Sequence, residues 1–538
     1  QLSPADPRLF GSFIEHMGRA VYTGIYEPSH PTADGAGFRR DVMDLIRPLR
    51  LTQIRYPGGN FLSGYRWEDG VGPREERPVR PDLAWQALEP NQVGTDDFLQ
   101  WCERLGTAPM LGVNLGTGTP RDAVNLLEYC NSALPTQYAS LRRRNGREAP
   151  YGVKLWCLGN EMDGPWQICA KTAQEYARTA HETAKMMKWL DPSVELVACG
   201  SSYRQMPTFG AWERAVLREC WDDIDYLSLH QYYKNTDGDV MSFLAASEEM
   251  DGFIREVASI CEEVRAERGS GKRVRLSVDE WNVWYHFQQE GRYPEKWICP
   301  RPIEEERYDF ADALLVGCML NTLLNNADTV KIACLAQLVN VIAPIMTEPG
   351  GGAWAQTTYW PFLYASRYGR GTVLKRSAEV PAYESAAGDE PYLSSAAVLS
   401  PDGGAVTLFL VNRCLTAELA VALDGVSGRP GVWLSLNGVP LSARGGRGET
   451  PSSRSWRRTS RSVINTCSRS SRCARTTVCS RPCSIRTSMP CMCRSCANAA
   501  QARSRASGSP NCAVVCYVTA RPNFPKRRRW RCCWMPSR

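Results

Sequence analysis

The first 340 residues alternate about eight times between strand-like and helix-like segments, and this alternation restricts the possible folds more than any other feature. The strand-like segments are short apolar runs. The helix-like segments place apolar residues three and four positions apart, as Val42, Leu45, Ile46 and Leu49 show. Eight strand–helix units predict a closed (β/α)₈ barrel, because parallel strands need covering helices between them.

The chain can be divided into the elements of such a barrel. The predicted strands are 11–15, 52–56, 110–114, 155–159, 195–200, 226–230, 274–278 and 329–333. The predicted helices are 38–50, 96–105, 121–131, 170–189, 207–219, 243–267 and 307–326. An open doubly wound sheet is the alternative, but it would need a Gly-rich phosphate-binding turn after the first strand, and residues 11–16 form none.

Beyond about residue 360 the pattern changes to short strands separated by turns. We predict strands at 394–399, 405–412 and 417–423, with a turn at 401–404. The predicted fold class is therefore α/β, a (β/α)₈ barrel followed by a C-terminal β-sandwich that is incomplete. The predicted domains are a catalytic barrel at 1–360, a partial sandwich at 361–440 and an aberrant or disordered tail at 441–538.

The composition of the C-terminal segment is unlike that of the rest of the chain. Residues 451–538 contain 18 Arg, one Lys and no acidic residue, and 11 of the 22 cysteines lie from Cys467 onward. One interpretation is a basic tail that binds nucleic acid. A cysteine metal module is a second, but Cys491, Cys493 and Cys496 lack a matching second pair of ligands. We favour a third, a shifted reading frame in G+C-rich DNA, which predicts poor solubility.

Residues 1–450 are acidic, with 45 basic and 57 acidic side chains and a net charge of −12. This balance gives no reason to expect a nucleic-acid partner. No run of about 18 apolar residues is present, so no membrane span is expected. The first eleven cysteines lie in apolar contexts, which is typical of reduced, buried thiols in a cytoplasmic protein. The chain starts at Gln1, so we expect its N-terminus to be incomplete.

Two carboxylates follow predicted strands of the barrel. Glu161 ends the fourth strand and Glu280 ends the seventh. Carboxyl ends of barrel strands meet at one mouth, where these folds carry their chemistry. Glycoside cleavage needs one protonated and one ionised carboxyl group, roughly 5–5.5 Å apart for retention of configuration and about 6.5–9.5 Å for inversion. We predict that Glu161 and Glu280 cleave a glycosidic bond.

Other strand ends also carry polar or aromatic groups. They include Glu15, Arg55, Asn60, Asn160, His230, Tyr232, Trp284 and Gln337. Buried polar groups need partners, and sugar hydroxyls supply them, so we predict substrate-binding roles for this set. Simpler interpretations remain: a lone Glu is usually solvated or caps a helix, Arg55 can pair with Glu15, and His230 can be a core histidine. The five histidines show no metal-ligand spacing, so neither a metal nor another cofactor is predicted.

Five motifs in order resemble those of the family 51 α-L-arabinofuranosidases of clan A. They are FIEHMGR at 13–19, IRYPGGN at 54–60, LGNEMDGPW at 158–166, DEWN at 279–282 and LAQLVN at 335–340. The resemblance covers residues 10–425. It implies a barrel with a β-sandwich that takes one strand from residues before the barrel, and an intracellular homo-oligomer.

The resemblance also implies an activity. Glu280 would be the nucleophile and Glu161 the general acid/base of a retaining double displacement. Glu15, Arg55, Asn60, Asn160, Tyr232 and Gln337 would bind the arabinofuranose, with His230 in the pocket wall. The enzyme would release terminal non-reducing α-L-arabinofuranosyl residues from oligosaccharides or polysaccharides. The alternatives are a β-xylosidase or endo-β-glucanase on the same barrel, and a non-catalytic carbohydrate-binding protein.

Overall fold

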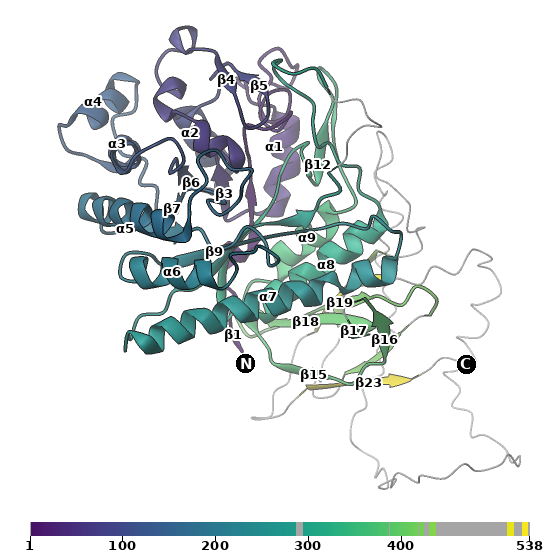
Figure 1. Ribbon diagram of the computed structural model, residues 1–538. Helices are drawn as coiled ribbons and strands as arrows, with labels where there is room; N and C mark the ends of the chain where they lie inside the picture. Colours follow the sequence, from purple (N-terminus) through teal and green to yellow (C-terminus); the bar gives the residue numbers. More distant parts are fainter. Residues whose placement is uncertain are drawn as a thin grey trace, which may run out of the picture.

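The computed structural model describes residues 2–286, 294–386, 388–417 and 419–423, and the strand segments 430–436, 514–520 and 530–535. A closed barrel of eight parallel strands lies at its centre (Figure 1). The barrel strands are β2 (Gly11–Phe13), β3 (Gln53–Tyr56), β6 (Ala108–Val113), β7 (Leu155–Leu158), β8 (Glu195–Ala198), β9 (Tyr226–Tyr233), β10 (Arg275–Val283) and β11 (Val330–Leu335). Each pairs with the next in this order, and β11 pairs with β2, so all eight predicted strands are confirmed.

Helices surround the barrel. The predicted ones are present as α1 (Arg40–Ile46), α2 (Thr95–Leu105), α3 (Pro120–Asn131), α5 (Ala173–Leu190), α6 (Ala211–Cys220), α7 (Val240–Glu267) and α8 (Phe310–Asn325). Two further helices, α4 (Gln137–Arg144) and α9 (Tyr359–Tyr368), were not predicted. The sequence of α4 has no apolar stripe, and only Ala139 and Arg142 are buried in it. None of the described helices combines the length and apolar character needed to cross a bilayer.

Helix α8 joins the barrel to the C-terminal sheets. It is buried on nearly every side because it packs against β10 of the barrel and against β18 (Leu393–Leu399) and β19 (Val406–Asn412) of the sheets. Asn321 of α8 donates a hydrogen bond to the Ser394 hydroxyl at 3.1 Å, and Asn325 donates to the Ser395 carbonyl at 3.0 Å. Apolar packing with these amide contacts fixes the sheets against the barrel.

The C-terminal region consists of an antiparallel sheet and a smaller mixed sheet, which lie below the barrel in Figure 1. One sheet has the order β1 (Ser3–Pro4), β14 (Thr372–Val373), β18, β19, β22 (Val514–Ala520) and β21 (Pro430–Leu436). A second contains β15 (Arg376–Ala378), β23 (Trp530–Met535) and β20 (Ala420–Leu423). The α/β fold class and the predicted strands at 394–399, 405–412 and 417–423 are confirmed.

The two ends of the chain contribute to these sheets. β1 precedes the barrel yet pairs with β14, as the resemblance implied. Strands β22 and β23 fall within the segment predicted as a tail. The prediction for the rest of 441–538 lies outside the described residues.

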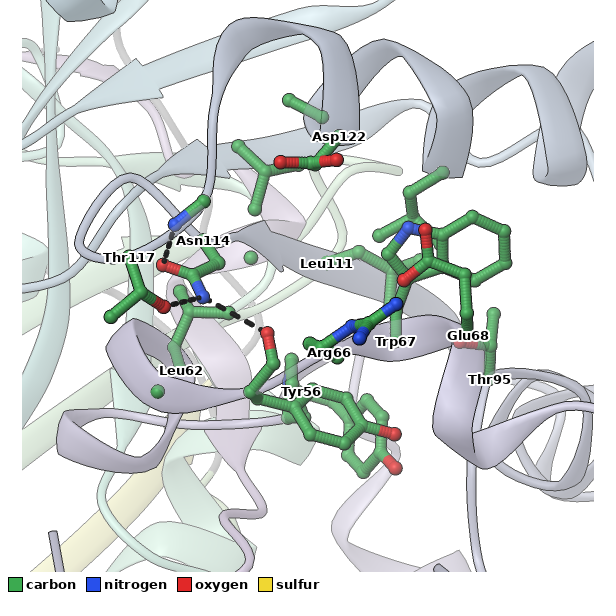
Figure 2. Close-up of a pocket in the computed structure, with 18 residues that line it drawn as sticks. Tyr56, Leu62, Arg66, Trp67, Glu68, Thr95, Leu111, Asn114, Thr117 and Asp122 are labelled. Atoms are coloured by element: carbon green, nitrogen blue, oxygen red, sulfur yellow. Dashed lines mark hydrogen bonds between the residues drawn. The ribbon is translucent and has the colours of Figure 1, made fainter. Parts of the chain in front are cut away.

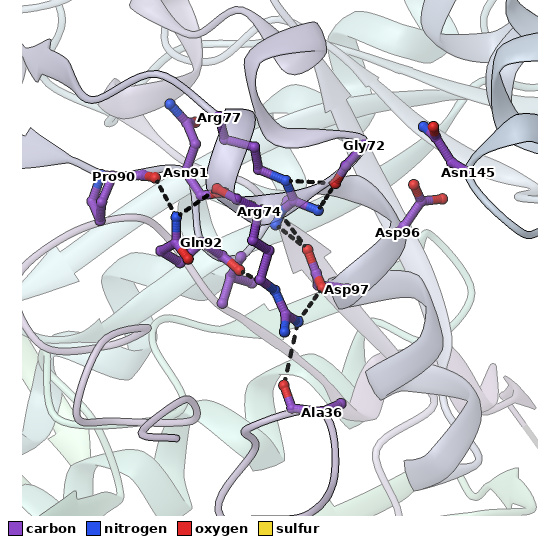
Figure 3. Close-up of polar contacts among 12 residues, drawn as sticks. Ala36, Gly72, Arg74, Arg77, Pro90, Asn91, Gln92, Asp96, Asp97 and Asn145 are labelled. Carbon is purple, nitrogen blue, oxygen red and sulfur yellow. Dashed lines mark hydrogen bonds and ion pairs between the residues drawn. The ribbon is translucent and has the colours of Figure 1, made fainter. Parts of the chain in front are cut away.

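A long segment between β3 and α2 lies at the edge of the barrel mouth. It contains the hairpin of β4 (Arg80–Asp82) and β5 (Ala87–Glu89). Figure 3 shows how the segment is held: Arg74 and Arg77 both pair with Asp97 in the first turn of α2, at 2.5 and 2.7 Å. Both arginines also donate to backbone carbonyls within the segment. This clamp, consisting of Arg74, Arg77 and Asp97, anchors the hairpin to the barrel.

Candidate active site

The chain turns sharply where β7 ends, and this turn presents Glu161. Gly159 has a φ of 87° and Glu161 a φ of 44°, so both lie in the left-handed region. Glycine adopts this region freely, whereas a glutamate there is strained. Glu161 accepts hydrogen bonds from His230 Nδ1 at 2.9 Å and from Trp166 Nε1 at 2.6 Å. The strained backbone therefore holds a partly exposed carboxylate between an imidazole and an indole.

A β-bulge in β10 brings two consecutive carboxylates to the inside of the barrel. On β9, Ser228 and His230 are two residues apart and face the same side. Their partners on β10 are Ser277 and Glu280, which are three residues apart, so β10 contains one extra residue here. An extra residue re-aims the side chains that follow it. Asp279 and Glu280 consequently both point toward the barrel interior.

Glu280 is buried and held by two donors from other strands. Arg55 Nη1 donates to its Oε1 at 2.5 Å, and the Tyr232 hydroxyl donates to its Oε2 at 2.7 Å. Arg55 also donates to Asn160 Oδ1 at 2.6 Å. The alternative pairing of Arg55 with Glu15 is thus replaced by pairing with Glu280. These two contacts fix the orientation of the Glu280 carboxylate.

Glu161, His230 and Glu280 form a compact cluster. One donor or acceptor atom from each lies within 4.8 Å of the other two. This spacing resembles that of a metal site, but His230 Nδ1 already lies 2.9 Å from Glu161 and 3.6 Å from Glu280. Because Arg55 and Tyr232 occupy both oxygens of Glu280, we describe the cluster as an ion-pair network.

Burial and neighbouring charges shift the pKa values in this network. Burial acts to lower the pKa of His230, but the charges of Glu280, Asp279 and Glu161 outweigh it and raise that pKa to about 10. Burial acts to raise the pKa of Asp279, but Arg55 and His230 outweigh it and hold that pKa below its usual value. At neutral pH the network contains an imidazolium and an ionised Asp279.

Glu15 stands beside this network in a different environment. Its carboxylate accepts from the Phe61 backbone N–H at 3.0 Å, from Trp85 Nε1 at 2.9 Å and from Gln337 Nε2 at 3.2 Å. Burial raises the pKa of Glu15 to about 8, and the nearby Glu280 charge adds to the effect. Close approach of the chain requires glycine at residue 59, where a Cβ would lie 2.5 Å from Glu15 Oε2.

The remaining predicted residues lie around these carboxylates. Trp284 packs edge-on against Tyr232 with ring centroids 5.0 Å apart, and its Nε1 donates to Glu304. Asn60 begins the 3₁₀ helix η3 (Asn60–Gly64), directly before Phe61. Six of the barrel strands (β2, β3, β7, β9, β10 and β11) therefore bring together the predicted residues Glu15, Arg55, Asn160, His230, Tyr232, Glu280 and Gln337.

Two residues of the site were not predicted. Trp85 lies between β4 and β5, and Arg301 Nη1 donates to its carbonyl at 2.6 Å. No periodic pattern in the sequence indicates that this hairpin reaches the mouth. Asp279 lies next to Glu280, and simple strand alternation would allow only one of these two side chains to face the interior. The bulge in β10, which lets both face it, has no signal in the sequence.

A separate cavity of about 410 Å³ lies between η3, the end of β6 and the start of α3 (Figure 2). Tyr56, Leu62 and Leu111 are among the residues that line it. Asn114 on its wall donates to the Tyr65 carbonyl and the Thr117 hydroxyl, both at 2.9 Å. The cavity contains none of the predicted site residues, so we place the candidate active site at the barrel mouth.

Comparisons with known proteins match this arrangement. The family model "Alpha-L-arabinofuranosidase 1 domain" matches residues 45–251, and the model "Alpha-L-arabinofuranosidase C-terminal domain" matches residues 279–467. The intracellular exo-α-(1→5)-L-arabinofuranosidase 1 of Bacillus subtilis is 56% identical over 414 residues, which are 77% of this chain and 83% of that protein. The chain belongs to the family 51 α-L-arabinofuranosidases. The resemblance predicted from five motifs is therefore confirmed, and the chain is a glycoside hydrolase.

Other family 51 members agree in sequence and fold. The exo-α-(1→6)-L-arabinofuranosidase of Bifidobacterium longum is 49% identical over 429 residues, 78% of this chain and 82% of that protein. The structure of a family 51 α-L-arabinofuranosidase from Bifidobacterium longum has a TM-score of 0.80 and 42% identity, and covers 83% of this chain and 90% of that chain. An arabinose complex of the Thermotoga maritima α-L-arabinofuranosidase has a TM-score of 0.73 and 34% identity, over 83% and 91% of the two chains.

Proposed function

We propose that this family 51 member releases terminal α-L-arabinofuranosyl units by a retaining double displacement, with Glu280 as nucleophile and Glu161 as general acid/base. The observation that carries the proposal is the separation of the two carboxylates, whose oxygens lie within 4.8 Å. Retaining glycosidases hold this pair roughly 5–5.5 Å apart, whereas inverting ones leave about 6.5–9.5 Å for a water molecule. The close pair favours direct attack by Glu280.

In the first step Glu280 attacks the anomeric carbon and the bond from that carbon to the leaving oxygen breaks. Glu161 gives its proton to the departing oxygen. Arg55 and Tyr232 hold the Glu280 carboxylate in its orientation until the new ester bond forms. Glu161 lies at the more exposed end of the cluster, which suits a group that meets the leaving sugar.

In the second step water attacks the same carbon and the ester bond to Glu280 breaks. Glu161, now ionised, accepts the proton from that water. Ester formation neutralises Glu280, so the attacking water meets Glu161 as the only free carboxylate of the pair. The second inversion at the carbon restores the original configuration.

The remaining predicted residues bind the sugar. At neutral pH, Glu15 is largely protonated, because its pKa is raised to about 8, and it then has a proton to donate to a sugar hydroxyl. Gln337 lies beside Glu15, and Asn160 lies beside Arg55. Asn60 begins the neighbouring turn. Trp284 and Tyr232 supply aromatic surface for the carbon face of the ring.

We propose arabino-oligosaccharides with α-(1→5) links as the first substrates to examine. The Bacillus subtilis relative is named for this link, and one from Bifidobacterium longum for α-(1→6). The name of the Bacillus subtilis protein includes "intracellular", and we propose the same location for this chain. A homo-oligomeric state stays a prediction.

The test compares aryl α-L-arabinofuranoside with aryl β-D-xyloside and follows the first product by NMR. We expect hydrolysis of the arabinofuranoside, with α-L-arabinofuranose released before mutarotation. A slow fluorinated arabinofuranosyl substrate should leave one sugar on the peptide that carries Glu280, as measured by mass spectrometry. Release of the β-anomer, preference for the xyloside, or labelling of another residue would overturn the proposal.

A further inference from the structure

Asp279 is a buried carboxylate that the proposed mechanism does not use. It is 1% exposed and lies below Glu280 because of the bulge in β10. Its Oδ1 accepts a hydrogen bond from the Ser228 hydroxyl and lies 3.3 Å from His230 Nε2. Its Oδ2 lies 3.8 Å from Arg55 Nε. The carboxylate thus faces two cations that themselves contact Glu161 and Glu280.

Each of these two cations has a buried nitrogen atom that lacks a hydrogen-bond partner in the part of the chain that the structure describes, and Asp279 lies close to both atoms. Among the described residues, neither His230 Nε2 nor Arg55 Nε has a hydrogen-bond acceptor with good geometry, although both atoms are buried. A buried N–H without a partner is costly, and a nearby negative charge reduces that cost. Another nitrogen atom of each cation contacts a carboxylate at the barrel mouth. His230 Nδ1 contacts Glu161, and Arg55 Nη1 contacts Glu280.

We propose that Asp279 is a positioning residue for the reaction, because its carboxylate is the counter-ion that orients His230 and Arg55 toward Glu161 and Glu280. The proposal rests on the proposed function of that pair. Asp279 contacts no reacting atom and acts only through the two cations. A buried carboxylate behind an imidazole fixes both the orientation of the ring and its protonation.

The charge balance across the reaction explains why such a residue is needed. In the resting state Asp279 and Glu280 balance Arg55 and His230, and Glu161 is protonated. After Glu280 becomes an ester, Glu161 is ionised and restores the same balance with Asp279. The two cations are therefore neutralised in both states, which avoids a buried net charge at either step.

The other titratable groups around Asp279 and His230 do not replace this charge. Those that face them are Arg55 from β3, Cys157 at the end of β7, Glu161 after it, Glu280 from β10, and the more distant Cys199 and Cys334. Burial raises the pKa of the Cys157 thiol well above its usual value, so it stays neutral. Asp279 is accordingly the fixed negative charge on the inner side of the imidazole.

The first experiment measures the pH dependence of kcat/KM for an aryl arabinofuranoside in Asp279→Asn. Loss of the charge removes one of the groups that raise the pKa of His230, so that pKa falls. Because His230 acts as an imidazolium that donates to Glu161, the alkaline limb should move to lower pH by about one unit or more. kcat should fall more than KM changes. An unmoved limb in a folded Asp279→Asn protein would overturn the proposal.

The chain offers a matched control in Asp41→Asn. Asp41 pairs with the buried Arg39 at 2.7 Å and accepts from the Thr32 hydroxyl, and its pKa is also lowered. This cluster shares no residue with the barrel mouth. Asp41→Asn should lower the melting temperature and leave the alkaline limb in place. An equal movement of the limb in both variants would show a general effect of destabilisation and would also overturn the proposal.

A second measurement needs no substrate, and its wild-type arm does not depend on a folded Asp279 variant. The chain has five histidines, so ¹³C-labelled histidine gives a simple spectrum, and His230→Gln assigns the relevant signal. In the wild type we expect His230 to stay an imidazolium beyond pH 8, and in Asp279→Asn to lose its proton earlier. Loss of the proton from wild-type His230 near the ordinary histidine pKa of about 6.5 would overturn the proposal. Absence of arabinofuranosidase activity in the wild type would instead overturn the proposed function.

Discussion

The ion-pair network at the barrel mouth and the clamp of Arg74, Arg77 and Asp97 use the same residue types in opposite ways. In the clamp, one carboxylate accepts from both arginines, and each arginine also donates to a backbone carbonyl (Figure 3). At the mouth, Arg55 and His230 each contact more than one carboxylate. The clamp pairs two cations with a single carboxylate, whereas the mouth brings several carboxylates close to two cations.

The difference shows how a chain rich in Arg–carboxylate pairs separates stability from chemistry. A pair whose members are satisfied keeps its charges fixed and holds two segments together. A cluster with more carboxylates than cations near it shifts pKa values and can move a proton during a reaction. The following predictions test this contrast, from the largest expected effect on activity to the smallest.

Replacement of Glu280 by Ala removes the proposed nucleophile and should have the largest effect. We expect kcat for an aryl arabinofuranoside to fall by more than about 10⁴-fold. The melting temperature should show that the protein is folded, since Arg55 keeps Asp279 and Asn160 as partners. A fall of less than tenfold would exclude Glu280 as the nucleophile.

Replacement of Glu161 by Ala should depend on the leaving group. With natural oligosaccharides kcat should fall roughly 10²- to 10⁴-fold, because their leaving oxygen needs a proton. An activated aryl substrate needs no proton in the first step, so formation of the glycosyl-enzyme should be spared. Azide should partly restore turnover by replacing water. Equal losses on both substrates would contradict an acid role for Glu161.

Replacement of Glu15 by Gln should change the pH dependence of stability. The pKa of Glu15 is raised to about 8, above its unfolded value, so the folded protein holds this proton longer than the unfolded chain. Wild-type stability should therefore decrease between about pH 5 and pH 8, and Gln, which resembles the protonated acid, should remove that decrease. Thermal unfolding of both proteins across this range measures it, and parallel curves would contradict the assignment.

Replacement of Asp97 by Asn breaks the clamp and should affect activity least. Asp97 binds Arg74 and Arg77 and also accepts from the Gly94 N–H at the start of α2. We expect a loss of about 2 kcal/mol in the free energy of unfolding, with kcat nearly unchanged. A modest rise in KM would reflect a looser hairpin around Trp85. A large fall in kcat would show that the clamp is coupled to the chemistry.

Much of the barrel was predictable because its signals are local. The eight strands are apolar runs ended by polar residues, and the helices between them carry apolar stripes, so both periods are visible in any short window. The helix α4 was missed because its buried face includes Arg142, which donates to the carbonyls of Tyr129 and Ser132 instead of packing as an apolar residue. The pairing of β1 with β14 joins residues more than 360 positions apart and has no local signal.

The candidate site was predictable as a set of residues but not as a network. Position at a strand end was enough to nominate Glu161, Glu280, Arg55 and Gln337. Trp85 was not predicted because it reaches the site on a hairpin held by distant contacts. Asp279 was not predicted because two consecutive residues of a strand face the interior only at a bulge.

The sequence by itself determined the barrel and the chemical types at its mouth, because both follow from the order of apolar and polar residues along the chain. Only the tertiary structure decided which charged groups lie close enough to form ion pairs. Arg55 and Glu280 are 225 residues apart, yet their atoms meet at 2.5 Å. Ionisation depends on burial and on distances of a few ångströms between such groups. Those distances are set by strand pairing and by one extra residue in β10, and no short stretch of the sequence predicts either feature.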